Sequence, residues 1–174
     1  MGFVEETGAA QYLRDVRITP IYEGTTGIQA NDLVGRKTRY DGGQGVEELI
    51  ADMQGTLDAL KGSQDEACHY AAAVLERHMQ MVTGASQKIL EEQSDVLVAG
   101  VANDYLMLMG YSTGCWAMAR SVLGVSNHED DSFKALKRSV CRFYFDAIAP
   151  HAEAHFIALQ NTDEAHFALP AEAL

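Results

Sequence analysis

Residues 96–123 read VLVAGVANDYLMLMGYSTGCWAMARSVL, and this stretch decides the fold. It is apolar on nearly every side at helical spacing, which is typical of a helix buried among other helices. Ser94 and Asp95 stand directly before it and offer a helix N-cap. Asn103, Asp104 and several glycines interrupt the apolar run, and a lipid-spanning helix would tolerate them poorly. The stretch therefore predicts the buried central helix of a soluble bundle, with no insertion into a membrane.

Three further segments show helical spacing. Residues 46–60 and 64–92 precede the central helix, and residues 132–159 follow it, with a kink expected at Pro150. The apolar stripe of this last segment consists of Phe133, Leu136, Val140, Phe143, Tyr144, Ala147 and Ile148. No strand-like alternation is visible in the sequence. We therefore predict an all-α fold, an antiparallel bundle of about four long helices joined by short loops.

Glycines interrupt the central helix at three positions, Gly100, Gly110 and Gly114. Each of them lowers the helix propensity of the segment. We therefore expect neighbouring helices to approach closely at these positions.

The first part of the chain has a different character. Residues 4–15 predict a helix, residues 16–21 are extended because Pro20 cannot continue it, and helical spacing returns after Thr26. Turn residues without an apolar face occupy 39–45. Residues 1–43 carry −1 of the formal net charge of −12, and the remainder carries −11. We therefore predict two domains, residues 1–43 as a helix–loop–helix segment and residues 44–174 as the four-helix domain.

Composition excludes some classes of partner. The chain is 47% hydrophobic and 22% charged, as in globular proteins, and its basic residues never cluster. A net charge of −12 argues against nucleic acid and against an anionic membrane surface. Cys68, Cys115 and Cys141 are far apart and form no CxxC pair. This spacing predicts reduced, buried thiols in an intracellular protein, which we place in the cytoplasm. No signal peptide is visible at the start.

Several residues could in principle form a site in the helical part. His151 and His155 lie one helical turn apart, as in some zinc sites, but no HExxH pattern or third ligand accompanies them. A solvated helix face is the better interpretation, and we predict no metal site. His69 and His78 are interpreted as surface or packing residues. Cys115 lacks a basic neighbour that would activate a thiol, so we assign it to the core.

Residues 21–29 read IYEGTTGIQ and offer the best candidate for chemistry. Glu23 stands before Gly24, which lets the backbone bend or approach a ligand closely. Thr25 or Thr26 can cap the helix that follows, and the free N–H groups of a helix N-terminus favour an anion such as pyrophosphate. Spacing alone favours the simpler interpretation, a loop glutamate before an ordinary capped helix.

The same run resembles the active-site segment of the acyl-CoA dehydrogenases, which reads Ile-Tyr-Glu-Gly-Thr followed by Ile-Gln. Met1-Gly2-Phe3 is similar to the end of that family's Gly-Gly-x-Gly-Phe flavin-contact turn, and residues 12–18 to its Arg-Asp-x-x-Ile approach. This resemblance covers residues 1–37. The four-helix pattern after it resembles the extra C-terminal domain of a branch that includes methylthiopropionyl-CoA dehydrogenases.

The resemblance implies α,β-dehydrogenation of an acyl-CoA, with Glu23 as the base that removes the α-proton and FAD as the hydride acceptor. It implies that Tyr22, Gly24 and Arg36 contact substrate, and that Gly2, Thr25, Thr26 and Gly27 lie along the flavin dinucleotide. Many relatives carry Ser-Gln at the positions of Thr26 and Gly27, and their substrate-site arginine stands one position away from Arg36. An electron-transfer flavoprotein and a homo-oligomer are the partners implied.

The family's N-terminal helical domain, its β-domain and the first helices of its flavin-binding bundle have no counterpart in these 174 residues. The chain is therefore expected to be a C-terminal fragment that is inactive alone and does not retain FAD. Residues 1–40 should then be mobile, or should dock on their own bundle or on another copy. The alternative is a helical docking or oligomerisation module in which Glu23 is only a loop carboxylate.

Overall fold

The computed structural model describes residues 8–19 and 25–167, and all the regular secondary structure in them is helical. This confirms the predicted all-α class. The elements are α1 (Ala9–Val16), α2 (Thr26–Val34), the π-helical turn η2 (Gly35–Arg39), α3 (Gln44–Lys61), α4 (Glu66–Glu91), α5 (Asp95–Val125), α6 (Asp131–Phe143), the π-helical turn η3 (Tyr144–Ile148), α7 (His151–Asn161) and the 3₁₀ turn η4 (Glu164–Phe167).

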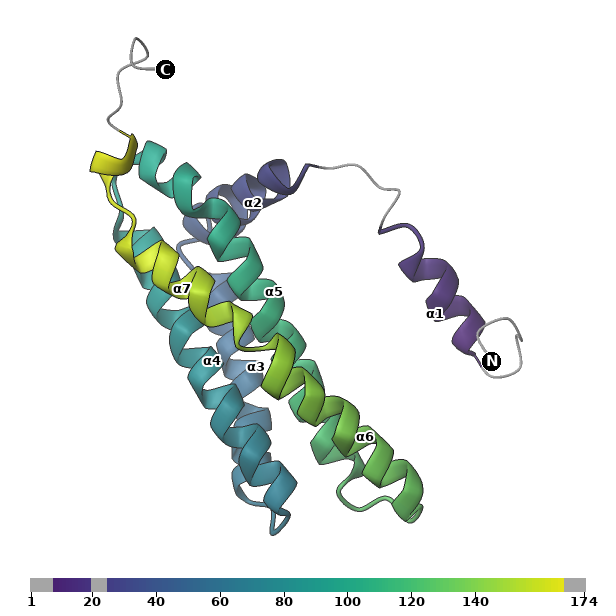
Figure 1. The fold of residues 1–174 in the computed structure, drawn as a ribbon. Coiled ribbons are helices and arrows are strands. Elements are labelled where there is room, and N and C mark those ends of the chain that lie inside the picture. The colour runs from purple at the N-terminus through teal and green to yellow at the C-terminus, as the bar shows by residue number, and fades with distance from the viewer. Residues whose placement is uncertain (1–7, 20–24, 168–174) are drawn as a thin grey trace.

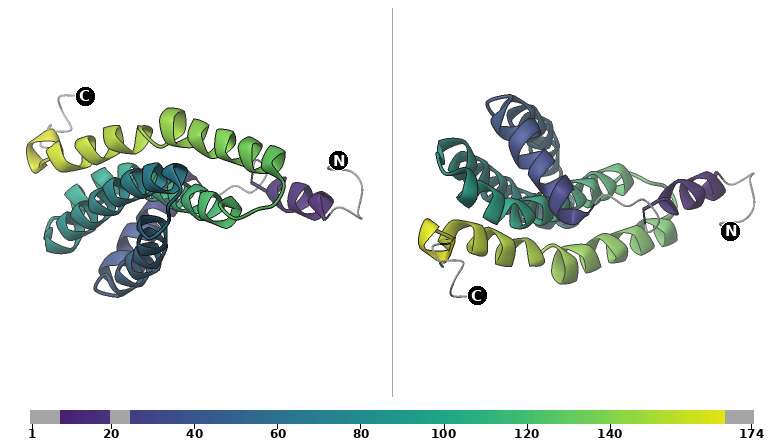
Figure 2. Two further views of the ribbon diagram at one scale, coloured as in Figure 1. Left: turned by 90° about the horizontal axis from the view of Figure 1, so that it is seen from below. Right: turned by 90° about the horizontal axis from the view of Figure 1, so that it is seen from above.

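Helix α5 is the centre of the bundle, as its sequence predicts (Figure 1). It packs against α2, α3, α4, α6 and α7. In Figure 2, α6 and α7 form a layer on one side of α4 and α5, and α3 lies on the other side. Two core clusters lie along α5, one around Tyr105 and one around Cys115, and both side chains are fully buried.

Local signals in the sequence explain where the helices begin. Ser94 caps α5 by accepting a hydrogen bond from Leu97 N at 3.3 Å. Asp65 and Asp130 cap α4 and α6 in the same way. In α3 the predicted stripe faces inward, and Met53, Leu57 and Leu60 are buried.

The fourth predicted helix differs from expectation. It is divided into α6 and α7, because the π-helical turn η3 and Pro150 interrupt it. The apolar stripe of α6 is also turned away from the bundle. Phe133, Leu136, Val140 and Phe143 are between 40% and 63% exposed, whereas Tyr144, further along the predicted stripe, is partly buried against the core. Cys141 is the buried residue of α6, and Phe145 follows it into the core from η3.

Close approach at the α5 glycines occurs at two of the three expected positions. A Cβ added at Gly114 would collide with the phenol of Tyr144, and one at Gly100 with the ring of Phe167. Nothing lies within 4 Å of the Cβ position at Gly110, so the expectation is wrong there. The close neighbours are aromatic side chains that occupy the space a Cβ would need.

Helix α2 docks on its own bundle. Ala30 and Val34 are buried in the core cluster that also contains Tyr105. Arg39, at the end of η2, donates a hydrogen bond to Asp95 at 2.7 Å and another to the carbonyl of Glu92 at 3.2 Å. Helix α1 lies beyond the end of the bundle in Figure 1 and in the two views of Figure 2. The division of the chain near residue 43 stays a prediction.

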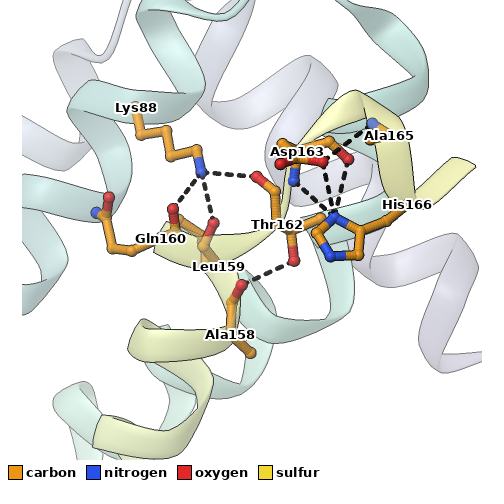
Figure 3. A network of polar contacts seen from close by, with 8 residues as sticks. All are labelled: Lys88, Ala158, Leu159, Gln160, Thr162, Asp163, Ala165 and His166. Carbon is orange, nitrogen blue, oxygen red and sulfur yellow. Dashed lines mark hydrogen bonds and ion pairs between the residues drawn. The ribbon is translucent and has the colours of Figure 1, made fainter.

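The C-terminal end of α7 is tied to α4 by a lysine. The ammonium group of Lys88 donates hydrogen bonds to the carbonyls of Leu159 and Gln160 at 2.8 Å and of Thr162 at 3.0 Å (Figure 3). A cation at this end also interacts favourably with the helix dipole. Beyond α7 the chain forms the 3₁₀ turn η4.

Candidate functional site

Four of the predicted site residues, Gly2, Tyr22, Glu23 and Gly24, lie outside the described residues. The structure describes the other four, Thr25, Thr26, Gly27 and Arg36. The roles assigned to all eight therefore stay predictions. The geometry of the second group nevertheless shows what the end of this segment offers to a ligand.

Thr25, Thr26 and Gly27 form the exposed N-terminus of α2. The side chain of Thr25 accepts a hydrogen bond from Ile28 N at 3.3 Å, which makes Thr25 the N-cap, one of the two candidates predicted. The first amides of an α-helix have no intrahelical acceptor. Nothing lies within 4 Å of the Cβ position at Gly27. An exposed helix N-terminus with open space beside it fits an anionic group such as the pyrophosphate of FAD.

Arg36 lies on η2, about 15 Å along the helical axis from Thr26. Its guanidinium group pairs with Asp32, with Nε 2.8 Å from Oδ1 and Nη2 3.1 Å from Oδ2. Lys37 lies 3.5 Å from the same carboxylate. The hydrogen bond from Arg36, with the charges of both cations, lowers the pKa of Asp32. Arg36 is thus engaged on the surface beside α2, and the described structure does not bring it to the helix N-terminus.

The histidines of the bundle have packing and hydrogen-bonding partners. His155 Nδ1 lies 2.8 Å from Asp104 Oδ1, and its ring stacks on Tyr111. The ring of His151 is tilted against that of Tyr111, with 5.8 Å between the ring centroids. Among residues 8–19 and 25–167, no three His, Cys, Asp or Glu side chains gather where they could hold a metal ion.

The cysteines are free and buried. Burial raises the pKa of Cys115 to about 12, so its thiol is neutral near pH 7 and is a poor nucleophile. The assignment of Cys115 to the core is confirmed. No helix in the described part of the chain is both long and apolar enough to cross a membrane.

A family model described as acetyl-CoA dehydrogenase C-terminal like matches residues 49–170, which run from α3 to beyond η4. The chain belongs to this family. The match lies within the residues whose helix pattern resembles the extra C-terminal domain, and so confirms the second of the two resemblances.

The curated proteins that this chain resembles are named as acyl-CoA dehydrogenases. A 3-methylmercaptopropionyl-CoA dehydrogenase of Ruegeria pomeroyi is 41% identical over 127 residues, 71% of this chain and 21% of the relative. The broad-specificity linear acyl-CoA dehydrogenase FadE5 of Mycobacterium tuberculosis is 37% identical over 62 residues, 36% of this chain and 10% of the relative. A butyryl-CoA dehydrogenase of Syntrophomonas wolfei is 25% identical over 187 aligned positions, 99% of this chain and 29% of the relative.

The chain thus matches less than a third of the length of each of these relatives. The match to the butyryl-CoA dehydrogenase extends over nearly the whole chain. The resemblance to the C-terminal part of acyl-CoA dehydrogenases is therefore confirmed, and the activity of the whole enzyme belongs to the proposal below.

The sequence analysis missed two polar side chains that link separate helices by hydrogen bonds. Lys88 was read only as part of a helix, although a lysine in a last helical turn is a common partner of carbonyl groups. Tyr105 was read as core, but its hydroxyl lies 2.8 Å from Ser86 Oγ and 3.5 Å from Thr38 Oγ1. These hydrogen bonds link α5, α4 and η2. Thr38 and Tyr105 are 67 residues apart, so no local sequence pattern predicts their contact.

Proposed function

We propose that this chain is the C-terminal part of an FAD-dependent acyl-CoA dehydrogenase of the cytoplasm, with Glu23 as the catalytic base. One observation carries the proposal. The segment Tyr22-Glu23-Gly24 leads directly into the exposed, Thr25-capped N-terminus of α2, in a chain that belongs to a dehydrogenase-associated family. The three free, buried cysteines support a reducing compartment.

In this proposal Glu23 takes a proton from the α-carbon of an acyl-CoA thioester. These protons are weakly acidic, so the carboxylate must be held close to the carbon in a pocket that excludes water. Burial beside apolar groups would raise the pKa of the carboxyl group toward the range useful for a base. FAD, when bound, accepts the hydride that leaves the β-carbon. Tyr22, Gly24 and Arg36 are assigned to the substrate, and an electron-transfer flavoprotein is the proposed electron acceptor.

The cofactor residues of this chain act through their backbone. In the proposal, the free amides of Thr26 and Gly27 at the start of α2 bind pyrophosphate oxygens. The cap at Thr25, which accepts from Ile28 N, supports this by fixing that end of the helix. Gly2 belongs to the same set by resemblance. Because these groups contact only part of a dinucleotide, the isolated chain is proposed to be inactive and to lose FAD on gel filtration. A visible absorption spectrum of the chain after incubation with FAD and gel filtration tests this, and retained flavin at a fixed stoichiometry would contradict it.

The role of Glu23 is tested by Glu23→Gln in a complete dehydrogenase that contains this sequence. Loss of a general base typically lowers the rate about 10²–10⁴-fold. Exchange of the substrate α-proton with solvent deuterium, followed by NMR, reports the base alone and should stop in the variant. Glu129→Gln, in the loop before α6, is the matched control and should keep full exchange. Undiminished exchange in Glu23→Gln would exclude Glu23 as the base.

A second candidate function is a docking or oligomerisation module with no chemistry. The exposed apolar face of α6 favours it, because a large apolar face on a soluble domain commonly marks an interaction surface. The two functions are separable, since Glu23→Gln affects only the first.

A further inference from the structure

Helix α6 presents an apolar face to solvent. Phe133, Leu136, Val140 and Phe143 follow the spacing i, i+3, i+7 and i+10, which places them along one side of the helix. We call these four residues the α6 apolar face. Leu136 and Phe143 are each 63% exposed, and Phe133, on which the ring of His128 packs at a centroid distance of 4.8 Å, is still 40% exposed. The amphipathic pattern of α6 is thus directed away from its own core, which indicates a partner outside the chain.

A second uncovered apolar surface lies between α3 and α4. It is a groove of about 570 Å³ whose floor includes Val46, Ile50 and Leu90. Glu47 and Glu91 also line it, and Ala51 lines it as an exposed residue. We call this surface the α3/α4 groove. An apolar groove between two helices is the kind of site that accepts the apolar face of a third helix.

The two surfaces match in length and charge. The α6 apolar face spans eleven residues, about 15 Å from the first to the last, and α3 lines the groove from Val46 to Gln54, about 12 Å. Helix α6 has four basic residues and one acidic residue, whereas α3 has four acidic residues and one basic residue. Lys134, Arg138 and Arg142 pair with carboxylates of their own chain. Lys137, at the edge of the apolar face, forms no ion pair within the described part of the chain and can meet Glu47 and Glu91.

The two surfaces cannot meet within one molecule. Both views in Figure 2 place α6 and α3 on opposite sides of the α4 and α5 layer. An α6 helix in the α3/α4 groove must therefore come from another copy. Such a contact joins two different surfaces, so it leaves one of each free and allows further copies to add.

We propose that the α6 apolar face of one copy docks in the α3/α4 groove of a second copy, with Lys137 beside Glu47 and Glu91. Burial of the four apolar side chains supplies most of the affinity. The charged pairs at the edge fix the direction of the helix in the groove. This contact is independent of the catalytic proposal, because it uses no residue before α3.

The test is the mass of this chain in solution, measured by sedimentation velocity and light scattering over a wide concentration range. Wild type should exceed the monomer mass and grow with concentration. Leu136→Ser removes the centre of the apolar face, and Ala51→Arg fills the groove and repels Lys137. Each variant alone should remain a monomer. An equal mixture of the two should form a one-to-one dimer, because each supplies the surface that the other has lost.

Ile157→Ser is the matched control, since Ile157 is an exposed apolar residue of α7 with a fractional exposure of 56%. It should associate like wild type. All three altered side chains are exposed, so circular dichroism should show unchanged folding. A wild type that is monomeric at every concentration overturns the proposal. So does an Ala51→Arg variant that still associates, which would indicate pairing of α6 with α6, or a mixture that fails to dimerise. Binding of monomeric wild type to anionic vesicles, lost in Leu136→Ser, would assign the face to a membrane and would also overturn it.

Discussion

His78 is a buried histidine with a defined partner. Its ring lies on α4 at 3% exposure, with Nδ1 3.0 Å from Ser112 Oγ on α5. Burial, with a smaller contribution from the charge of Arg77, lowers the pKa of His78 to about 4 from its usual 6.5. The ring is therefore neutral in the native state at pH 7, and protonating it works against folding.

This pKa predicts that the protein loses stability in acid. Between pH 6.5 and about 4 the unfolded chain binds a proton that native His78 does not, so stability falls as the pH drops through this window. The loss from pH 7.5 to pH 5 should be about 2 kcal/mol from this residue alone. Urea unfolding of wild type and His78→Asn at both pH values measures it. Equal pH dependence in the two proteins would show that His78 titrates normally.

Two glycines of α5 should respond oppositely to the same substitution. Gly110→Ala should stabilise the protein by about 0.5–1 kcal/mol, because alanine favours the helix and its Cβ enters open space. Gly114→Ala should destabilise it by about 1 kcal/mol or more, because its Cβ displaces Tyr144, whose hydroxyl donates to the carbonyl of Tyr111 at 3.1 Å. Thermal unfolding compares the two. A stabilised Gly114→Ala variant would mean that Tyr144 moves away freely.

At the scale of the element, α7 depends on a residue of another helix. Lys88 of α4 satisfies three carbonyls at or just past the end of α7 (Figure 3). Without the ammonium group these acceptors lose their partner and the helix dipole loses a favourable charge. Since η4 follows directly, the same contact also fixes the position of the last turn of the described chain.

Lys88→Ala should therefore cost about 1–3 kcal/mol of unfolding free energy, the range for hydrogen bonds to a charged group. Lys61→Ala is the control. Lys61 pairs with Glu76 at 2.7 Å, but both side chains are about half exposed, so its loss should change stability by less than about 0.5 kcal/mol. Hydrogen exchange should show faster opening of α7 in Lys88→Ala only. Equal effects of the two substitutions would contradict the special role of Lys88.

The helices also show where a periodic pattern is insufficient. In α3 the apolar stripe faces the core, whereas in α6 the apolar stripe faces solvent. The pattern determines which side chains share a face, but what lies opposite that face depends on where the helix docks. Cys141 of α6 and Phe145 of η3 are the residues that enter the core cluster beside α5. Because α6 docks through Cys141, its more apolar face points outward.

At the scale of the whole molecule, α2 and α1 have different relations to the bundle. Ala30 and Val34 of α2 are essentially inaccessible to solvent and lie in a cluster with α4 and α5. In α1, by contrast, Tyr12, Leu13 and Val16 are between 53% and 76% exposed. The structural unit therefore includes α2, although its sequence resembles a different part of a dehydrogenase from the bundle.

Two truncations test this difference. Removal of residues 1–24 should change the unfolding free energy by no more than about 0.5 kcal/mol, because the large apolar side chains of α1, the helix described in this stretch, are exposed. Removal of residues 1–34 should cost about 3 kcal/mol or more, because it uncovers the cluster that Ala30 and Val34 fill. Urea unfolding of both chains gives the comparison. A large loss on removing residues 1–24 would mean that the first segment packs on the bundle.

The sequence predicted much of the fold and less of the candidate site. It predicted the central helix, a cap at Ser94 or Asp95, and a cap at Thr25 or Thr26, because these depend on residues within a few positions of one another. It also pointed to Thr26 and Gly27 as a ligand-facing helix start, where the structure shows an exposed N-terminus. It could not show that Arg36 pairs with Asp32 or that Tyr105 links three elements, since such contacts depend on how surfaces meet.

The sequence by itself determined that the chain is helical, where most of its helices begin, and which segment lies at the centre. Propensity, capping and periodicity are local properties, so the amino-acid order suffices for them. Only the tertiary structure decided that α2 belongs to the core, that Lys88 holds the end of α7, and that the apolar face of α6 is left uncovered. Each of these depends on contacts between segments far apart in the sequence, where the docking of whole helices determines which side chains are buried.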